Sequence, residues 1–474
     1  MAATTGATTQ TEEHVSLKLL LNEKGNKVLF AEAGKDFVDI LCSFLTMPLG
    51  TIARLVEKES SIGPVTLGCL NSLYQSVADL DGSCFYNDAV KQMLLKPSNF
   101  AEDYCNTLKL NIDDTPPTMY WACSYNSTCG LYSGLTVSTN NRCRCGYSLT
   151  GPVFPKHYCQ GFVNGVATFV ITDDLIVMPS CIDYSSFGLL LEFGIKNTSL
   201  LKERVLNVTK QKVLDLLKCS LLSNATLTNL FLGKKPSIEV SRFLSPDVEL
   251  NGSLQIILKL VIRKSDGKVL CAQGEQDFAN LLLSFLTLPL GGATRIFGKN
   301  CSMGSINELY KSMTELNENK YFISKDPKNR LVDPWPCISP HLKLCKEILP
   351  ILQPGLTDYY YENGYGVQYF KAGEDTSFFG TLKKLNVSNL RNIDSYMKGP
   401  ALYVVTDDLV VAPLSPISAL GLLNQFKTPL NDLKEKVITI GVKESISILK
   451  AGLTSTSALT NGLAHLLNEV KEEK

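Results

Sequence analysis

The chain has 474 residues, which exceeds the size at which one hydrophobic core stops growing, so two or more domains are expected. Its 46 Lys and Arg residues balance 46 Asp and Glu residues, and 45% of the chain is hydrophobic, as in ordinary globular proteins. This balance disfavours a protein that binds nucleic acid through phosphate contacts. No apolar run approaches the ~18 residues of a membrane-spanning helix, so we expect no membrane partner.

The first 13 residues are predicted to form a disordered tail, because they are polar and contain neither a basic start nor an apolar stretch. Since no signal peptide is recognised, we expect an intracellular protein, in the cytoplasm or alternatively the nucleus. The 15 cysteines are then expected as reduced thiols or metal ligands and not as a disulfide framework.

A hairpin followed by a helix opens the predicted fold. Residues 16–22 and 27–31 have the composition of strands, and Glu23 to Asn26 supply the turn. Asp36 is the expected N-cap of a helix over 36–46, which Pro48 ends. Its predicted buried stripe consists of Phe37, Ile40, Leu41, Phe44 and Leu45.

Further along, residues 166–171 and 175–178 are predicted strands joined by the turn Thr172-Asp173-Asp174. A helix near 183–193, a strand near 204–209 and a helix over 211–222 complete the predicted unit.

The second half of the chain repeats this pattern. Aligned without gaps, residues 16–56 and 257–297 share 18 identities in 41 positions, most densely in SFLTMPLG at 43–50 and SFLTLPLG at 284–291. Two full domains explain so long a period better than a solenoid does. We therefore predict an α+β protein with two tandem homologous domains built from β-hairpin and helix units. The predicted boundaries are 14–235, with a cysteine-rich insertion near 123–145, then a linker over 236–252 and a second unit over 253–474.

The SFLTxPLG segments, the Thr-Asp-Asp-Leu turns at 172–175 and 406–409, and the stretch LKAGLTSTSALTN at 449–461 resemble the plant family catalogued as domain of unknown function 674. The similarity runs from about Val15 to about Leu467. The resemblance implies a plant source and a two-copy layout, and it implies no activity.

One cluster of residues indicates a particular chemistry. Cys123, Cys129, Cys143 and Cys145 lie within 23 residues of a polar segment, and four thiolates are a ligand set for a structural Zn²⁺. The resembled family tends to carry C-x-x-C here, whereas this chain has C-x-C, which strains chelation by one loop. His157 or Cys159 is an alternative fourth ligand. The other interpretation is a loop with incidental cysteines.

Other motifs favour structural roles. Asp173-Asp174 and Asp407-Asp408 are interpreted as turn residues and not as magnesium ligands, because adjacent strand residues point to opposite faces. The tyrosine-rich segment 359–370 favours a hairpin over a ligand-stacking loop. The four histidines never fall at equivalent positions of the two halves, so no duplicated histidine triad is expected.

Together these features favour a non-enzymatic protein that binds an unidentified protein or small molecule, with zinc as its one expected cofactor and no catalytic residue assigned. The alternative is an enzyme whose site lies in the cleft between the two repeats.

Overall fold

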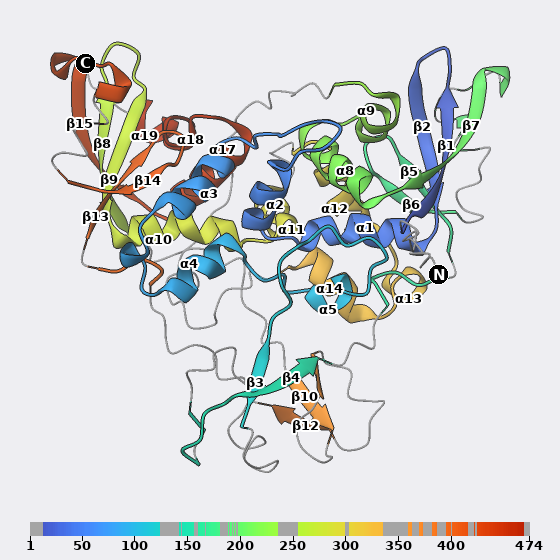
Figure 1. Cartoon of the computed structure of the whole chain (residues 1–474). Coiled ribbons are helices and arrows are strands. Elements are labelled where there is room, and N and C mark those ends of the chain that lie inside the picture. The colour runs from blue at the N-terminus through green and yellow to red at the C-terminus, as the bar shows by residue number, and fades with distance from the viewer. Residues whose placement is uncertain are drawn as a thin grey trace, which may run out of the picture.

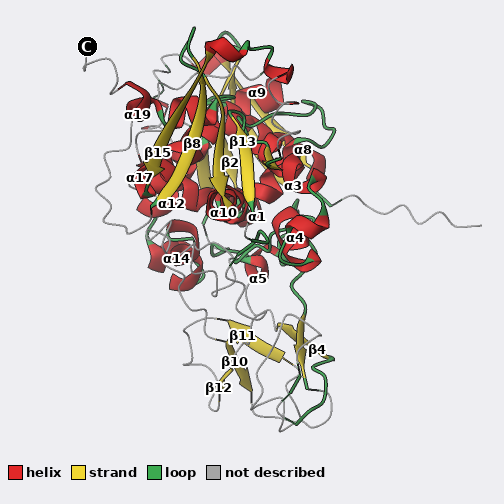
Figure 2. Cartoon of the chain, turned by 90° about the vertical axis from the view of Figure 1, so that its left-hand side faces the viewer, coloured by secondary structure: helices red, strands yellow, loops and turns green. Residues whose placement is uncertain are grey.

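The computed structural model describes the chain in separate ranges. They are 13–123, 142–143, 145–155, 160–165, 167–180, 198–235, 255–298, 303–334, 359–362, 369–372, 382–385, 395–399, 401–415 and 424–468, with the single residues 188, 190, 191, 193, 195 and 421. Two five-stranded sheets lie at opposite ends with helices between them, and a third sheet, whose five strands are short, projects below (Figures 1 and 2).

The elements of the first half follow in chain order. They are β1 (Val15–Asn22), β2 (Lys27–Ala33), α1 (Lys35–Thr46), α2 (Leu49–Val56), α3 (Leu70–Asp79), η1 (Gly82–Cys84), α4 (Asp88–Leu95), α5 (Glu102–Cys105), β3 (Tyr120–Ala122), β4 (Gly151–Pro155), β5 (Phe169–Thr172), β6 (Val177–Pro179), η2 (Thr198–Leu200), β7 (Leu201–Val208), α8 (Lys210–Leu222) and α9 (Thr226–Leu232).

The second half has a matching series. It consists of β8 (Ile256–Arg263), β9 (Val269–Glu275), α10 (Gln276–Ser284), η3 (Phe285–Thr287), α11 (Leu290–Phe297), α12 (Ile306–Glu315), α13 (Glu318–Tyr321), α14 (Lys325–Val332), β10 (Tyr359–Glu362), β11 (Tyr369–Ala372), β12 (Leu382–Leu385), β13 (Leu402–Thr406), β14 (Val411–Pro413), η5 (Leu430–Asp432), β15 (Leu433–Ile440), α17 (Val442–Thr454), α18 (Ala458–Gly462) and α19 (Ala464–Asn468).

The chain is α+β, as predicted, and its two large sheets have the same strand order. One runs β6-β5-β2-β1-β7 and the other β14-β13-β9-β8-β15, and every pairing in them is antiparallel. The register also agrees, since Lys18 faces Glu32 in one sheet and Lys259 faces Gln273 in the other. The predicted hairpins at 16–31 and 257–272 are therefore confirmed.

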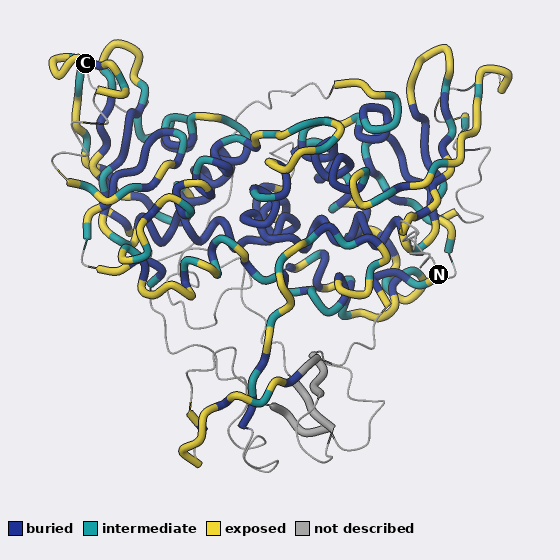
Figure 3. Tube along the Cα trace, viewed as in Figure 1, coloured by how far each residue is buried: buried dark blue, intermediate teal, exposed yellow. Residues whose placement is uncertain are grey.

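The first helix of each half is present where it was predicted, but its cap differs. α1 begins at Lys35 with Gly34 as N-cap, so Asp36 lies in the first turn, where a carboxylate still interacts favourably with the helix dipole. The predicted stripes are confirmed: Phe44 and Phe285 are both fully buried. Every residue of α1 from Phe37 to Thr46 is buried, because α1 also packs against helices of the other half (Figure 3).

The SFLTxPLG segments form the junction between the halves. The N–H of Leu49 donates to the carbonyl of Leu288 at 2.8 Å, and the N–H of Leu290 donates to the carbonyl of Met47 at 2.9 Å. The glycine that ends each segment allows this approach, because a Cβ on Gly50 would lie 3.0 Å from a backbone oxygen of the other half. The duplicated motif is thus explained by contact between its own two copies.

The halves also exchange packing partners. α3 contacts β14 of the second half, and α12 contacts β6 of the first. The N–H of Cys69 donates to the carbonyl of Gly452 at 2.6 Å, and the N–H of Ser305 donates to the carbonyl of Ser220 at 2.8 Å. One hydrophobic cluster consequently runs from Val15 to Leu463. The division at 14–235 and 253–474 stays a prediction about the sequence.

The third sheet combines strands of both halves in the order β12-β10-β11-β4-β3. Within the described part of this sheet, β11 pairs with β4 in parallel, with Tyr369 facing Phe154, and the other pairings are antiparallel. β10 and β11 form the antiparallel hairpin that was predicted for residues 359–370. The burial of its tyrosines, residues 1–12, the whole linker 236–252 and most of the predicted helix near 183–193 lie outside the described residues.

None of the helices that the structure describes is long and apolar enough to span a lipid bilayer.

Candidate metal centre

A tight turn brings two of the predicted ligands together. The N–H of Cys143 donates to the carbonyl of Tyr147 at 2.8 Å, and the N–H of Gly146 donates to the carbonyl of Cys143 at 2.9 Å. Gly146 has a φ of +89°, a conformation that strongly favours glycine. The Cys-Gly pair in the sequence therefore supplies both a sulfur and the residue that closes the turn behind it.

Cys123 reaches this turn from a neighbouring strand. It follows β3 directly, and β3 pairs with β4 such that Ala122 faces Gly151. Cys123, Cys143 and Leu149 form a small buried cluster, while Cys145 is exposed at its edge. The cluster thus lies beside the pairing of β3 with β4, at one edge of the third sheet.

The three sulfurs lie at distances that suit one metal ion. The Sγ atoms of Cys123 and Cys145 are 3.5 Å apart, and those of Cys123, Cys143 and Cys145 all lie within 4.8 Å of one another. Two sulfurs of a tetrahedral zinc site are separated by roughly 3.8 Å, given a Zn–S distance of ~2.3 Å. The C-x-C spacing therefore does not prevent convergence.

A backbone hydrogen bond within the turn reaches one of the sulfurs. The N–H of Cys145 donates to the Sγ of Cys143 at 3.4 Å. Thiolates are the form in which cysteines bind Zn²⁺.

The predicted fourth ligand is not among the residues that the structure describes. Cys129, which was predicted to complete the set, falls outside the described residues, as do the alternatives His157 and Cys159. Three of the four predicted cysteines are therefore brought together, and the fourth position stays a prediction.

The Asp-Asp pairs lie in turns, as interpreted from the sequence, but one buried carboxylate of each pair also accepts hydrogen bonds from a threonine. Asp173 accepts hydrogen bonds from the N–H and the Oγ1 of Thr228, both at 2.7 Å, and Asp407 accepts the same two bonds from Thr460. The hydroxyl of Thr228 in turn accepts from the N–H of Val28 at 2.9 Å. Burial raises the pKa of the Asp173 carboxyl. These aspartates connect a turn, a helix and a strand.

Sequence reasoning missed this contact although the signal was present. The Leu-Thr-Asn triplets at 227–229 and 459–461 are repeated together with the Asp-Asp turns. The Asp-Asp turn offers hydrogen-bond acceptors and the Leu-Thr-Asn triplet offers donors. Because both motifs occur in both halves, a contact between the turn and the triplet of each half could have been predicted.

A cleft of about 730 Å³ lies where the two halves meet, between Tyr86 of the first half and residues of the second. The N–H of Tyr86, which lines the cleft, donates to the carbonyl of Tyr396 at 2.9 Å. Its described lining includes Glu275, Gln276 and Lys398, with neither histidine nor cysteine. The side-chain oxygen of Gln276 has no hydrogen-bond partner among the described residues.

Comparison with known proteins gives one match. The sequence model of a family described as "Protein of unknown function (DUF674)" matches residues 11–444. No curated protein and no solved structure matches the chain.

Proposed function

Because this chain belongs to the family of proteins of unknown function DUF674, which brings no activity with it, we propose a function from its own residues. The protein is a non-enzymatic binding protein whose first half holds a structural zinc ion. Cys123, Cys143 and Cys145 supply three of the ligands, and Cys129 supplies the fourth.

The observation that carries this proposal is the convergence of three sulfurs from two separate segments within 4.8 Å. Zinc prefers such thiolate sets, and four protein ligands leave no open position for a substrate or a reactive water. The ion is accordingly structural.

The third sheet explains why a structural ion is useful there. Among the described residues, Cys123, Cys143 and Leu149 form a small buried cluster of their own, separate from the main core. So small a cluster contributes little hydrophobic stabilisation by itself, and a bound metal ion can stabilise a small fold in its place. Because β4 of this sheet also pairs with β11, the ion would support a unit built from both halves.

Metal analysis tests this proposal. Protein purified without chelator should contain close to one zinc per chain, and the double variant Cys143→Ser/Cys145→Ser should lose it. Cys84→Ser is the matched control, because Cys84 lies in the helical part of the chain and should leave zinc content unchanged. Zinc-free protein, or a double variant that keeps its zinc, would overturn the proposal.

A binding role also agrees with the contacts of the paired aspartates. The carboxylates of Asp173 and Asp407 each accept a hydrogen bond from a threonine hydroxyl. A zinc–thiolate site suits a reducing compartment, which supports the expected cytoplasmic location. The partner is a protein or a small molecule.

The alternative, an enzyme with its site between the halves, is supported by the unsatisfied oxygen of Gln276 in the cleft. The variant Gln276→Leu tests this alternative. A small molecule that binds in the cleft should bind the variant more weakly, whereas unchanged binding of small molecules would leave the cleft without a role.

A further inference from the structure

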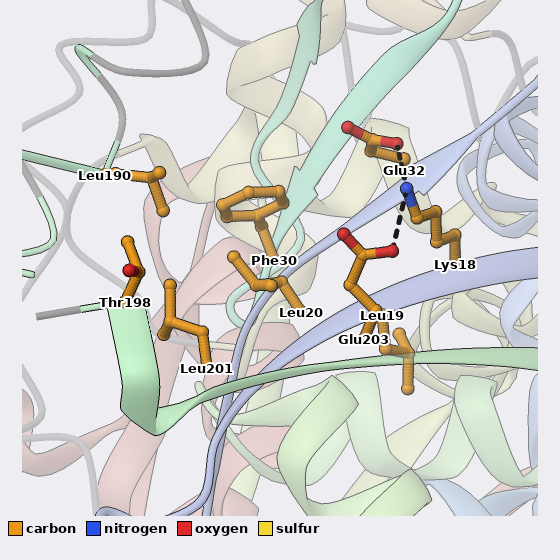
Figure 4. Close-up of a pocket in the computed structure, with 9 residues that line it drawn as sticks. All are labelled: Lys18, Leu19, Leu20, Phe30, Glu32, Leu190, Thr198, Leu201 and Glu203. Carbon is orange, nitrogen blue, oxygen red and sulfur yellow. Dashed lines mark ion pairs between the residues drawn. The ribbon is translucent and has the colours of Figure 1, made fainter.

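A second hollow, of about 360 Å³, opens on the face of the first large sheet that points away from the helices. Figure 4 shows Lys18 with two carboxylates at one end and apolar side chains at the other. Its lining consists of Lys18, Leu19, Leu20, Phe30, Glu32, Leu190, Thr198, Leu201 and Glu203. It is far in the fold from the cysteine cluster, which lies on the third sheet (Figure 1).

The apolar end is built around one aromatic ring. Phe30 is buried in a small cluster on this face, which is separate from the main core. Leu20, Leu190 and Leu201 pack against this small cluster. The ring of Phe193 stacks on Phe30 with 5.9 Å between centroids. The apolar end of the hollow therefore contains an aromatic ring that a second ring contacts.

The polar end carries a net negative charge. The Nζ of Lys18 lies 3.2 Å from a carboxylate oxygen of Glu203 and 3.7 Å from one of Glu32. One ammonium on β1 thus pairs with two carboxylates on β7 and β2, the strands on either side of β1, which leaves one net negative charge.

The other large sheet provides an internal comparison, because its strand register is identical. There Lys259 pairs with Glu435 at 3.0 Å, as Lys18 pairs with Glu203. The positions of Glu32 and Phe30, however, are taken by Gln273 and Cys271. The second sheet therefore has neither the additional carboxylate nor the ring.

Stability of the sheet does not explain this difference. The side chains of Lys18 and Glu32 are 45% and 40% exposed, and an exposed ion pair contributes only ~0–1 kcal/mol. The second sheet folds to the same register with Gln273 in place of the carboxylate. Glu32 is therefore a carboxylate that the shared register does not require, present in one sheet only and beside a hollow, where it is available to a ligand.

We propose that this hollow binds a primary amine with an apolar or aromatic body. The ammonium would contact the Oε1 atoms of Glu32 and Glu203, which the ion pairs with Lys18 do not use and which point toward the apolar end of the hollow in Figure 4, and the body would pack on Phe30 and Leu201. Carboxylates and an aromatic ring are the groups that recognise an organic ammonium ion. A carboxylate ligand would instead meet the surplus negative charge. The inference rests on the binding-protein part of the proposed function and not on zinc.

The test uses 2-phenylethylamine and its anionic counterpart phenylacetate, titrated into the full-length protein by calorimetry or ligand-observed NMR. The amine should bind, and its affinity should fall as salt is raised. Phenylacetate should bind more weakly or not at all. Equal affinity for both, or no binding of the amine, would overturn the proposal.

Variants then locate the site. Glu32→Gln copies the second sheet and should weaken amine binding by about three- to five-fold, the effect of one exposed ion pair, and Glu32→Asp should restore part of it. Glu435→Gln, at the equivalent of Glu203 in the other sheet, is the matched control and should change nothing. A Glu32→Gln variant that binds as the parent does, or an equal loss in Glu435→Gln, would contradict this location.

Failure of the zinc proposal is distinguishable from failure of this one. Zinc content is measured on the same preparations, and Cys143→Ser/Cys145→Ser should lose zinc while it retains amine binding. Loss of amine binding in that variant would contradict a site on the first sheet.

Discussion

Asp39 and Asn280 occupy equivalent positions in α1 and α10, and their side-chain oxygens accept the same pair of backbone hydrogen bonds. The Oδ1 of Asp39 accepts from the N–H groups of Phe162 (2.7 Å) and Val163 (2.9 Å). The Oδ1 of Asn280 accepts from Tyr396 and Met397, both at 3.0 Å. The charge differs, because Lys35 pairs with Asp39 whereas Gln276 occupies the equivalent position beside Asn280.

This relationship predicts a non-additive effect on stability. Burial raises the pKa of the Asp39 carboxyl, and Lys35 opposes that rise. Lys35→Gln alone should leave a buried carboxylate without its cation and cost about 3–5 kcal/mol at neutral pH. The double variant Lys35→Gln/Asp39→Asn copies the second half and should recover most of that loss. Urea unfolding measures both, and equal losses in the single and double variants would refute the interpretation.

The junction glycines give a second prediction. A Cβ on Gly50 or Gly291 would lie 3.0 Å from a backbone carbonyl oxygen of the other half, which cannot move as a side chain end can. Gly50→Ala and Gly291→Ala should each lower the free energy of unfolding by about 1–3 kcal/mol through overpacking. Gly165→Ala is the control, because its nearest neighbour would be a flexible lysine carbon at 3.9 Å. If all three variants unfold alike, the close approach is not what selects glycine.

A third prediction concerns pH. Burial raises the pKa of Glu102 to about 7 from its ordinary value of 4.5, although Thr118 donates two hydrogen bonds to this carboxylate. Since the folded state holds the proton more tightly than the unfolded state, the stability contributed by Glu102 falls as pH rises from about 4.5 to 7.

Glu102→Gln should therefore be more stabilising at pH 7.5 than at pH 5, by at most about 3 kcal/mol. Chemical unfolding of parent and variant at both values measures the difference. A stability difference between parent and variant that does not change with pH would show that Glu102 is solvated in the folded state.

The sequence predicted those strands and helices in which apolar residues recur at a regular spacing. The alternation in residues 16–22 and the spacing of Phe37, Leu41 and Phe44 each report the environment of a single element, so hairpin and helix followed directly. Because residues 257–297 repeat residues 16–56, the same hairpin and helix were predicted in the second half.

Other features depend on contacts between distant residues and had no such signature. The hydrogen bond from Cys69 to Gly452 joins residues far apart in the chain, so the exchange of helices between the halves could not be deduced from either segment. The helix N-cap was assigned to Asp36 because a carboxylate is a common cap, whereas Gly34 takes that place.

The candidate metal site was only partly predictable. Residue type and spacing identified Cys123, Cys143 and Cys145 as candidate ligands, and the structure brings their sulfurs together. The pairing of β3 with β4, which brings Cys123 to that turn, depends on tertiary structure. The surplus charge beside Lys18 became visible only when the register of the two sheets was compared.

X-ray absorption at the zinc edge of the purified protein tests the central claim most directly, because it reports which atoms surround the metal. A structural site should give three or four sulfur neighbours at about 2.3 Å. Four sulfurs would assign Cys129 or Cys159 to the open ligand position, and three with one nitrogen would assign His157. A shell of oxygen and nitrogen without sulfur, or protein without zinc, would contradict the claim that Cys123, Cys143 and Cys145 hold a metal ion.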